Sequence, residues 1–597
     1  MRSPVESGRL GPAKDPVMSG SDKTTGEFSR RWWPALGLAL VLALYVFYVL
    51  RIRPANLFAV AQDDTIYFSS AKALAAGQGY VLPNLPGSPP ATKYPILYPW
   101  ILSWVWRWNP SFPANLSAAL GITLISGVAY VILAFLFLRR LRGIGEWEAL
   151  GLTAFCALNP AFLYFSSSVV SEVPFAALGL AAILVGNRGM NRESRPGWAV
   201  SSGILAGLTM LMRVLGIAFA AGLFCAALAR RAWKQAAIVA ACTVPALVMT
   251  ALNAARRVAM PAGFDAAGPG FRSTWIYYMS YLGFRKLSMV SAHLIATMLA
   301  SQVTYFFTEL PAEFLSPLFH ANLGLLLVGS IAVDWMVFAG LIRQMREDQP
   351  QPIHFALPFT VAAIFFWDFP EVRRFLIPFL PLLAAALWLE GKWIAGQLFA
   401  AMRTRKTRVE RAFAAALLAA LCAGGLGIAW NFAANKDRAE LRRTSLNRGA
   451  LLVEKREAYD WIRRNAPEGA RAVAGEDGSF YLYTGRQAMA HIALQRAGAY
   501  DDAYLQNDLA HVTDVARAIG AQYWLASPDD SDKQWRAAKP PLAARYNEVE
   551  EVLPELFRSS GGQVRIYGLG CVQRPDMPEC QVADRVLFPQ GFGNSEH

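Results

Sequence analysis

The sequence carries little charge for its length, since charged residues make up 17% of its 597 positions and hydrophobic residues make up 54%. This excludes one ordinary soluble domain. The apolar residues are spread over many separate runs, and each run of about 17–25 such residues can cross a bilayer as a helix. The composition therefore predicts an all-α polytopic membrane domain.

The chain also lacks the common signatures of several enzyme classes. Its six histidines are scattered, so we expect no histidine-based metal site. There is no GxxxxGK[ST] loop, no HExxH motif and no GxSxG elbow, which leaves phosphate-loop, zinc-peptidase and serine-hydrolase chemistry without support. No internal repeat is visible, and no small-residue cleavage site follows the first apolar run, which predicts a retained helix.

Basic residues indicate which loops face the cytoplasm. The formal net charge of +14 comes mainly from short loops between the apolar runs. Such loops are cytoplasmic by the positive-inside rule, so the charge does not indicate nucleic-acid binding. The basic loops are 30–31, 139–142, 188–195, 230–234, 343–346 and 403–411.

These loops predict a cytoplasmic tail (1–31) and a membrane domain (32–433) of about eleven transmembrane helices. Its larger outer loops are 51–113 and 254–321. The apolar segment 291–307 is expected to be an interfacial helix, because a span there would put the basic loop 343–346 outside. A twelfth span stays open as the alternative. The predicted spans are 32–50, 116–138, 150–165, 173–186, 197–211, 215–228, 236–252, 323–342, 353–369, 375–389 and 412–433.

The last 164 positions, residues 434–597, become charged and mixed in composition. Helical periodicity over 454–465 and short strand patterns at 472–474, 522–526 and 564–567 predict a small α/β domain. The parity of the spans places this C-terminal domain outside the cytoplasm.

Cysteines differ between the two parts of the chain. Cys571 and Cys580 bracket a polar loop in the C-terminal domain, so an oxidising compartment would allow a disulfide between them. The other four cysteines lie in apolar runs and are expected to be inert.

The first outer loop carries two adjacent acids, Asp63 and Asp64, a few residues beyond a predicted span. One of them can cap a predicted helix over 65–76, but capping does not clearly explain both. A carboxylate at this boundary can also be tuned to act as a general base, with Tyr67 on the next turn to orient it.

Lys93 follows in the same loop, within a turn bracketed by prolines before a predicted helix over 100–108. It can extend its amine to the membrane surface, or it can offer a point charge to a phosphate.

Further charged residues stand at predicted span ends. Glu172 can pair with a helix dipole, and Arg213, amid apolar sequence, needs a partner or anchors at the interface. The outer turn that contains Arg373 and Arg374 also holds Glu371. Guanidinium groups suit phosphate oxygens, and a salt bridge with that glutamate is the alternative.

Several short motifs follow one another along most of the chain. They are Asp63-Asp64-x-x-Tyr67, Gly77-x-Gly79-Tyr80, Lys93-Tyr94-Pro95-x-x-Tyr98-Pro99, Ser171-Glu172-x-Pro174, Leu211-x-Arg213-x-x-Gly216, Arg374-Phe375-Leu376-Ile377-Pro378-x-Leu380-Pro381, and Trp461-Ile462 through Tyr483-Thr484-Gly485-Arg486. Their joint order resembles the GT-C class of membrane glycosyltransferases, specifically bacterial relatives of aminoarabinose transferases and protein O-mannosyltransferases.

The resemblance implies a GT-C-like fold and a sugar donor linked to a polyprenyl phosphate. It implies a lipid, glycan or protein acceptor on the outer face of the inner (plasma) membrane. A first-loop aspartate would be the base. Lys93, Arg213, Arg373 and Arg374 would bind the donor phosphate, with Tyr67, Tyr94 and Glu172 in support. Asp64 stands where the family has glutamate, which leaves open which acid is the base and whether a divalent cation is needed; no other cofactor is expected.

Two other functions remain open at this point. A transporter or flippase of lipid-linked sugars would tend to show repeats and broken helices with polar groups near the midplane. Here the notable charges lie at span ends on one face, which favours surface chemistry. A non-catalytic assembly subunit could share the same fold.

Overall fold

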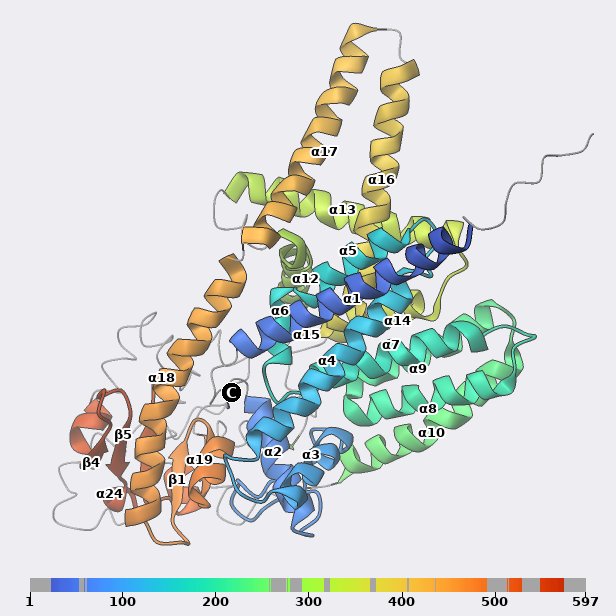
Figure 1. Cartoon of the computed structure of the whole chain (residues 1–597). Helices are drawn as coiled ribbons and strands as arrows, with labels where there is room; N and C mark the ends of the chain where they lie inside the picture. Colours follow the sequence, from blue (N-terminus) through green and yellow to red (C-terminus); the bar gives the residue numbers. More distant parts are fainter. Residues whose placement is uncertain are drawn as a thin grey trace, which may run out of the picture.

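The computed structural model describes residues 23–52, 58, 62–256, 258, 275, 278–279, 292–315, 323–365, 372–404, 407–434, 436–490, 513, 515–528 and 548–573. Long apolar helices form a membrane domain, and a small sheet with its own helices forms a second unit at one end of it (Figure 1). The predicted combination of an all-α membrane domain and a small C-terminal α/β domain is confirmed.

Every predicted span is helical over its described residues, and positions 366–369 of the span 353–369 lie outside them. The α-helices of the membrane domain are α1 (Lys23–Ile52), α4 (Leu116–Leu138), α5 (Glu146–Ala157), α6 (Pro160–Ser166), α7 (Glu172–Gly189), α8 (Pro196–Met212), α9 (Ile217–Ala229), α10 (Trp233–Ala255), α12 (Ala292–Leu315), α13 (Leu323–Glu347), α14 (Pro352–Phe365), α16 (Leu380–Thr404) and α17 (Arg408–Ala434). Short elements join some of them: η1 (Val214–Gly216), α15 (Val372–Leu376) and η5 (Ile377–Phe379).

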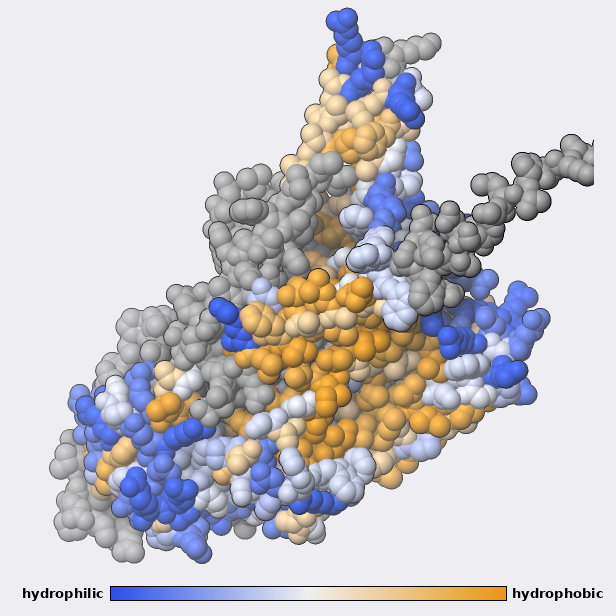
Figure 2. Space-filling view, viewed as in Figure 1, coloured by the Kyte–Doolittle hydropathy of each residue, from blue (hydrophilic) through white to orange (hydrophobic). Residues whose placement is uncertain are grey.

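Apolar side chains cover the outside of this helical domain. Figure 2 shows a hydrophobic band over the helices, between hydrophilic residues of the C-terminal domain and hydrophilic loops at the opposite end. In α1, for example, Leu36, Leu40 and Phe47 are more than half exposed. Outward-facing apolar residues of this kind belong against lipid, so the chain is a membrane protein.

Within the described ranges, four helices are long and apolar enough to cross a membrane, or five if a bent pair counts as one span. Three shorter apolar helices accompany them. The four are Trp32–Ile52, Leu116–Leu138, Trp233–Ala255 and Arg373–Thr404. The full number of eleven spans, the orientation in the membrane and the boundary at residue 433 therefore stay predictions.

One predicted span is wrong as a single helix. The segment 150–165 is divided between α5 and α6, whose axes differ by 58°. Pro160 has no backbone N–H and would clash with the preceding turn, so it starts a new helix. The Asn159 side chain accepts hydrogen bonds from the backbone of Ala161 and Phe162 and caps that helix.

Residues 292–307 of the predicted interfacial helix 291–307 lie within the longer helix α12, and position 291 is outside the described residues. This helix packs against α13, α14 and α15. Its position relative to the bilayer stays a prediction.

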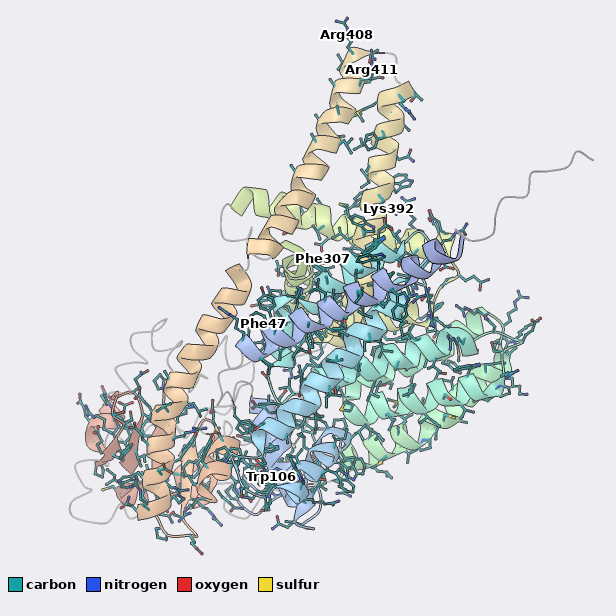
Figure 3. All side chains as sticks on the ribbon, viewed as in Figure 1. Phe47, Trp106, Phe307, Lys392, Arg408 and Arg411 are labelled. Carbon is teal, nitrogen blue, oxygen red and sulfur yellow. The ribbon has the colours of Figure 1, made fainter. Side chains whose placement is uncertain are left out.

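Helices α16 and α17 form a hairpin that projects beyond the other helices (Figure 1). Arg408 and Arg411 lie at its far end, and Lys392 lies near its base (Figure 3). Lys392 anchors the base, because its amine donates to the Gly143 carbonyl at 2.9 Å and to Glu148 at 2.8 Å.

The C-terminal domain begins with α18 (Lys436–Asn465), which leads from the membrane domain to the sheet (Figure 1). The sheet order is β2-β1-β3-β5-β4, with β1 parallel to β2 and β3, and β5 antiparallel to β3 and β4. The elements are β1 (Arg471–Ala474), α19 (Asp477–Thr484), β2 (Gln487–Met489), β3 (Tyr523–Ala526), β4 (Glu555–Arg558), β5 (Arg565–Gly568) and α24 (Gly570–Gln573).

The three predicted strands are confirmed as β1, β3 and β5. The strands β2 and β4, which form the two edges of the sheet, were not predicted. The predicted helix over 454–465 is the final part of α18. Its Tyr459 and Ile462 pack with Leu525 and Ile566 of the sheet, so α18 closes the core of this domain.

The first outer loop contains two helices that pack on one another, α2 (Gln62–Ala75) and α3 (Leu97–Trp108). Both helices predicted in this loop are confirmed. The helix α19 of the C-terminal domain follows β1 and packs on α2. The loop that carries the predicted acids is thus held between the membrane domain and the C-terminal domain.

Candidate active site

The first turn of α2 presents Asp63 to two side chains that are distant in sequence. The Tyr94 hydroxyl donates to Asp63 Oδ1 at 2.5 Å, and Arg374 Nη2 donates to Oδ2 at 2.6 Å. Both carboxylate oxygens therefore face side chains from other segments. Capping of α2 does not account for this arrangement, because a cap would turn its oxygen toward the helix backbone.

The charges around Asp63 keep it ionised. Burial acts to raise the pKa of Asp63. The positive charges of Arg374 and Lys93 and the hydrogen bonds from Tyr94 and Arg374 outweigh burial and lower the pKa to about 2. At neutral pH the group is a carboxylate, and in this arrangement it is a weak base.

Glu172 is the second acid of the cluster and the first residue of α7. It is buried, with 1% of its surface exposed. Its Oε1 accepts from Arg374 Nε at 2.7 Å and pairs with Arg213 Nη1 at 2.8 Å. Its Oε2 is buried and has no hydrogen-bond partner in the described part of the chain. One carboxylate oxygen thus gathers two arginines, and the other is left unused.

Arg213 lies at the break between α8 and η1, where the backbone becomes extended. Its Nη1 also donates to the Ser171 hydroxyl at 3.0 Å. That hydroxyl shares a hydrogen bond of 3.1 Å with the Tyr67 hydroxyl of α2. The partner that the sequence required for this arginine is therefore Glu172, and Tyr67 joins α2 to the start of α7.

Lys93 is buried near Asp63, so it does not extend toward solvent. Its amine lies 5.3 Å from the centre of the Tyr94 ring. Burial lowers the pKa of Lys93 to about 8, against the attraction of Asp63, which raises it, while Arg374 lowers it further. The amine is protonated at neutral pH, but it is easier to deprotonate than an ordinary lysine.

Aromatic side chains fix the position of Tyr94. The Tyr67 ring packs edge-on against Tyr94 and Tyr98, with centroids 4.9 Å and 5.2 Å away. The Tyr80 hydroxyl donates to the Tyr94 carbonyl at 2.9 Å. Tyr80 was not predicted as a site residue, and its place in a Gly-x-Gly-Tyr motif was the available signal.

Cations converge on the two carboxylates of this cluster. Arg374 pairs with both Asp63 and Glu172, Arg213 pairs with Glu172, and the charge of Lys93 acts on Asp63. Burying charged groups is costly unless they are paired. Cations that converge in this way can also bind an anion.

Two predicted site residues lie beside this cluster. Asp64 is buried, with 1% exposure, and its Oδ1 accepts from the Thr65 backbone at 2.8 Å. Arg373 precedes Arg374 in α15, with a partly exposed side chain. The contacts given above favour Asp63 and Arg374, and the roles of Asp64 and Arg373 stay predictions. Glu371, the alternative partner for the arginines, lies outside the described residues.

In the described ranges, no group of three or more His, Cys, Asp or Glu side chains could hold a metal ion. Cys571 is bonded in a disulfide. Its predicted partner, Cys580, lies outside the described residues.

No family model and no curated protein matches the chain. It is similar to two structures of ArnT from Cupriavidus metallidurans, one bound to undecaprenyl phosphate (TM-score 0.48) and one in the apo state (0.47). Both are 14% identical over 90% of this chain and 98% of the other. It is also similar to the Archaeoglobus fulgidus oligosaccharyltransferase in complex with Zn and sulfate, with 16% identity, a TM-score of 0.48, and coverage of 88% and 72% respectively. The chemistry proposed below rests on the side chains of this chain.

Proposed function

We propose that this protein is an integral-membrane glycosyltransferase. It moves a sugar from a polyprenyl-phosphate donor to an acceptor on the outer face of the inner membrane. The observation that supports it most is the convergence of Lys93, Arg213 and Arg374 on the ionised Asp63 and on the buried Glu172. A leaving lipid phosphate is the kind of anion that guanidinium and ammonium groups bind well.

The basic residues stabilise the leaving group. In the transfer, the acceptor oxygen bonds to the anomeric carbon as the bond from that carbon to the phosphate oxygen breaks. The electron pair leaves with the phosphate, whose charge rises. Lys93, Arg213 and Arg374 lie where they can bind that charge in a site with little water.

Asp63 takes the proton of the acceptor hydroxyl or orients that hydroxyl. Its low pKa makes it a weak base while Arg374 and Tyr94 occupy its oxygens. A donor phosphate competes for Arg374, and each contact that Arg374 transfers to the phosphate raises the pKa of Asp63. Donor binding would thereby release and strengthen the base. Glu172 Oε1 would keep the two arginines in place during this exchange.

The proposal is tested with full-length protein in lipid nanodiscs and a set of polyprenyl-phosphate sugars. Transfer is measured by mass spectrometry as release of polyprenyl phosphate and gain of sugar on acceptors from a deletion strain. The account requires turnover by the wild-type protein and its loss in Asp63→Asn. Movement of intact lipid-linked sugar between leaflets without release of phosphate would indicate a flippase instead. Binding of the donor without either activity would indicate an assembly subunit.

A further inference from the structure

The C-terminal domain touches the helix that carries Asp63. Gly478, near the start of α19, lies directly against Thr65 of α2. A Cβ atom at position 478 would stand 2.4 Å from the Thr65 hydroxyl oxygen and 2.8 Å from its Cβ. No other residue type fits at this approach unless one of the helices moves. The contact is two residues from Asp63.

Beside this contact, Asp477 forms a buried junction. It is fully buried, and it accepts from Asn84 Nδ2 at 2.6 Å and from the Tyr278 hydroxyl at 3.0 Å. Asn84 is fully buried as well, and its Oδ1 accepts from the Ser69 hydroxyl of α2 at 3.3 Å. One carboxylate of the C-terminal domain thus connects α2, the first outer loop and the segment around Tyr278.

The same junction reaches the lysine of the cluster by a second route. Met279 follows Tyr278, and its carbonyl accepts from the Thr92 hydroxyl at 2.6 Å. Thr92 immediately precedes Lys93. The junction therefore adjoins both Asp63, through α2, and Lys93, through residues 278–279.

A buried carboxylate is a costly way to join two domains, because its desolvation must be offset by its hydrogen bonds. Such a group fixes direction and distance more strictly than apolar packing does, since each oxygen must meet its donor. The hydrogen bonds of Asp477 therefore restrict the positions of the segments that carry Asp63 and Lys93, the two loop residues of the proposed reaction.

We propose that Asp477 is a positioning residue, through which the C-terminal domain holds α2 and the Thr92–Lys93 turn in their reactive places. This rests on the proposed function, because it assigns the junction a role in transfer at Asp63. Asp477 does not contact the reacting atoms. It acts through Asn84 and Tyr278.

The test exchanges the acid and the amide. Asp477→Asn sets an amide donor against the amide donor of Asn84, and Asn84→Asp sets two carboxylates 2.6 Å apart. The double variant Asn84→Asp/Asp477→Asn restores one acid and one amide. The new side chain at position 84 can still accept from Ser69, and the new side chain at position 477 can still accept from Tyr278. We expect each single variant to lower kcat about tenfold to a hundredfold with donor KM changed less than about threefold. The double variant should regain most of the lost kcat.

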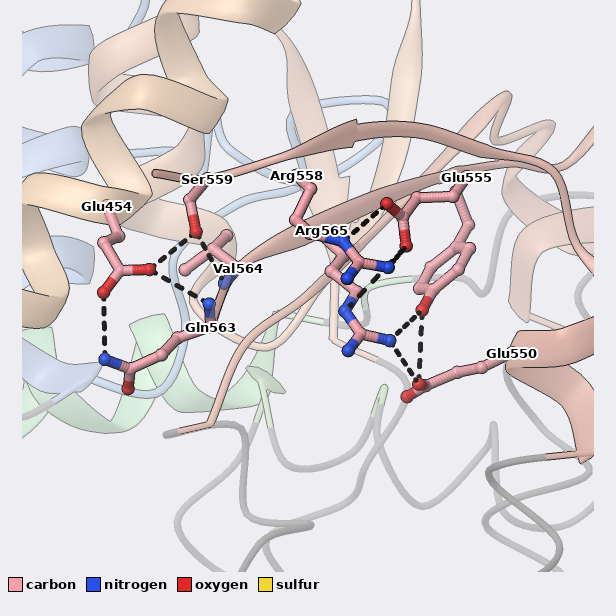
Figure 4. Close-up of polar contacts among 9 residues, drawn as sticks. Glu454, Glu550, Glu555, Arg558, Ser559, Gln563, Val564 and Arg565 are labelled. Carbon is pink, nitrogen blue, oxygen red and sulfur yellow. Dashed lines mark hydrogen bonds and ion pairs between the residues drawn. The ribbon is translucent and has the colours of Figure 1, made fainter. Parts of the chain in front are cut away.

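Glu454→Gln is the matched control. Glu454 is also a buried carboxylate of the C-terminal domain, and it accepts from the Ser559 hydroxyl at 2.6 Å and from Gln563 within that domain (Figure 4). We expect it to lower the Tm of the purified protein as Asp477→Asn does, with kcat unchanged. Equal loss of kcat in both variants would overturn the proposal, as would wild-type kcat in a folded Asp477→Asn protein.

A disulfide assay keeps the test independent of activity. The variant Thr65→Cys/Gly478→Cys brings two thiols together at the α2–α19 contact. Their Cβ atoms would start 2.8 Å apart, so the helices must separate by about 1 Å to reach the spacing of a disulfide. The disulfide yield should fall when Asp477→Asn is added and return when Asn84→Asp is added as well. An inactive wild-type protein with this pattern would refute the proposed function and leave the junction standing. A yield that Asp477→Asn does not change would overturn the junction itself.

Discussion

Two buried glutamates in this protein hold arginines in different ways. Glu390 of α16 receives Arg343 on both oxygens, at 2.8 Å and 3.3 Å, and the guanidinium stacks on Trp393 with 3.9 Å to the ring centre. Glu172 takes Arg213 and Arg374 on one oxygen and leaves the other without a partner among the described side chains. Both glutamates are 1% exposed.

The two glutamates differ in whether both of their carboxylate oxygens have hydrogen-bond partners among the described residues. The Arg343–Glu390 pair is bidentate and joins α13 to α16, as a structural ion pair does, and Arg343 also lies 3.8 Å from the exposed Glu347. The Glu172 cluster shares its arginines between two acids and leaves one buried carboxylate oxygen without a hydrogen bond among the described residues. In the proposed function these shared arginines bind the donor phosphate, and the Arg343–Glu390 pair is the control.

The largest effect is expected at Asp63. Asp63→Asn keeps the size of the side chain and one acceptor oxygen but removes the base, so turnover should fall about 10²–10⁴-fold. Asp64→Asn should cost less, because Asp63 makes the contacts to Tyr94 and Arg374. Both variants are compared at matched protein levels with one lipid-linked sugar. Near wild-type turnover in both would remove the catalytic assignment.

The next effect is at Arg374, which joins the two acids. Arg374→Ala should lower kcat/KM for the donor about 10²–10³-fold, because it removes a donor to the leaving phosphate. Arg373→Ala is the neighbouring comparison, and we expect a smaller loss, measured by steady-state kinetics over a range of donor concentrations. An equal loss in the two variants would show that general positive charge, and not the Arg374 fork, is what matters.

A smaller effect is expected from pH. Since the pKa of Lys93 is about 8, its amine is charged below that pH and neutral above it. The kcat/KM for the donor should therefore fall about three- to tenfold as the pH rises from 7 to 9. Lys93→Arg, which stays charged throughout, should remove this alkaline fall. A fall that persists in Lys93→Arg would assign the titration to another group.

The smallest effect on activity is expected at the Arg343–Glu390 pair. Arg343→Ala leaves Glu390 buried without its partner, which should lower the free energy of unfolding by roughly 2–3 kcal/mol after allowance for the partial exposure of Arg343. Donor KM and kcat should stay within about twofold of wild type in the fraction that remains folded. Thermal inactivation and steady-state kinetics of the same preparation measure both. A rise in donor KM in Arg343→Ala without a loss of stability would contradict the assignment of the Arg343–Glu390 pair as purely structural.

The sequence predicted much of this architecture, because its signals are local. Apolar runs marked the helices, and Pro160, visible in the sequence, explains the one span that is divided. Asp63, Lys93, Arg213 and Arg374 were each singled out in the sequence as candidate site residues.

Their partners could not be predicted from one sequence. Arg374 meets Asp63 across 311 positions, and Asp477 meets Asn84 across 393. Such pairings depend on how the helices pack, and no periodicity encodes them. The choice between Asp63 and Asp64 was open for the same reason, since adjacent residues differ only in the direction that α2 gives them.

The central claim is that the Asp63–Arg374 cluster is built to receive a lipid phosphate. Equilibrium binding of a polyprenyl phosphate, without sugar, to the full-length protein in nanodiscs tests it most directly. We predict that binding weakens more than about tenfold in Arg374→Ala and in Lys93→Ala, since each loses a charge-assisted contact, and is unchanged in Arg343→Ala. Equal affinity in all four proteins would contradict the account.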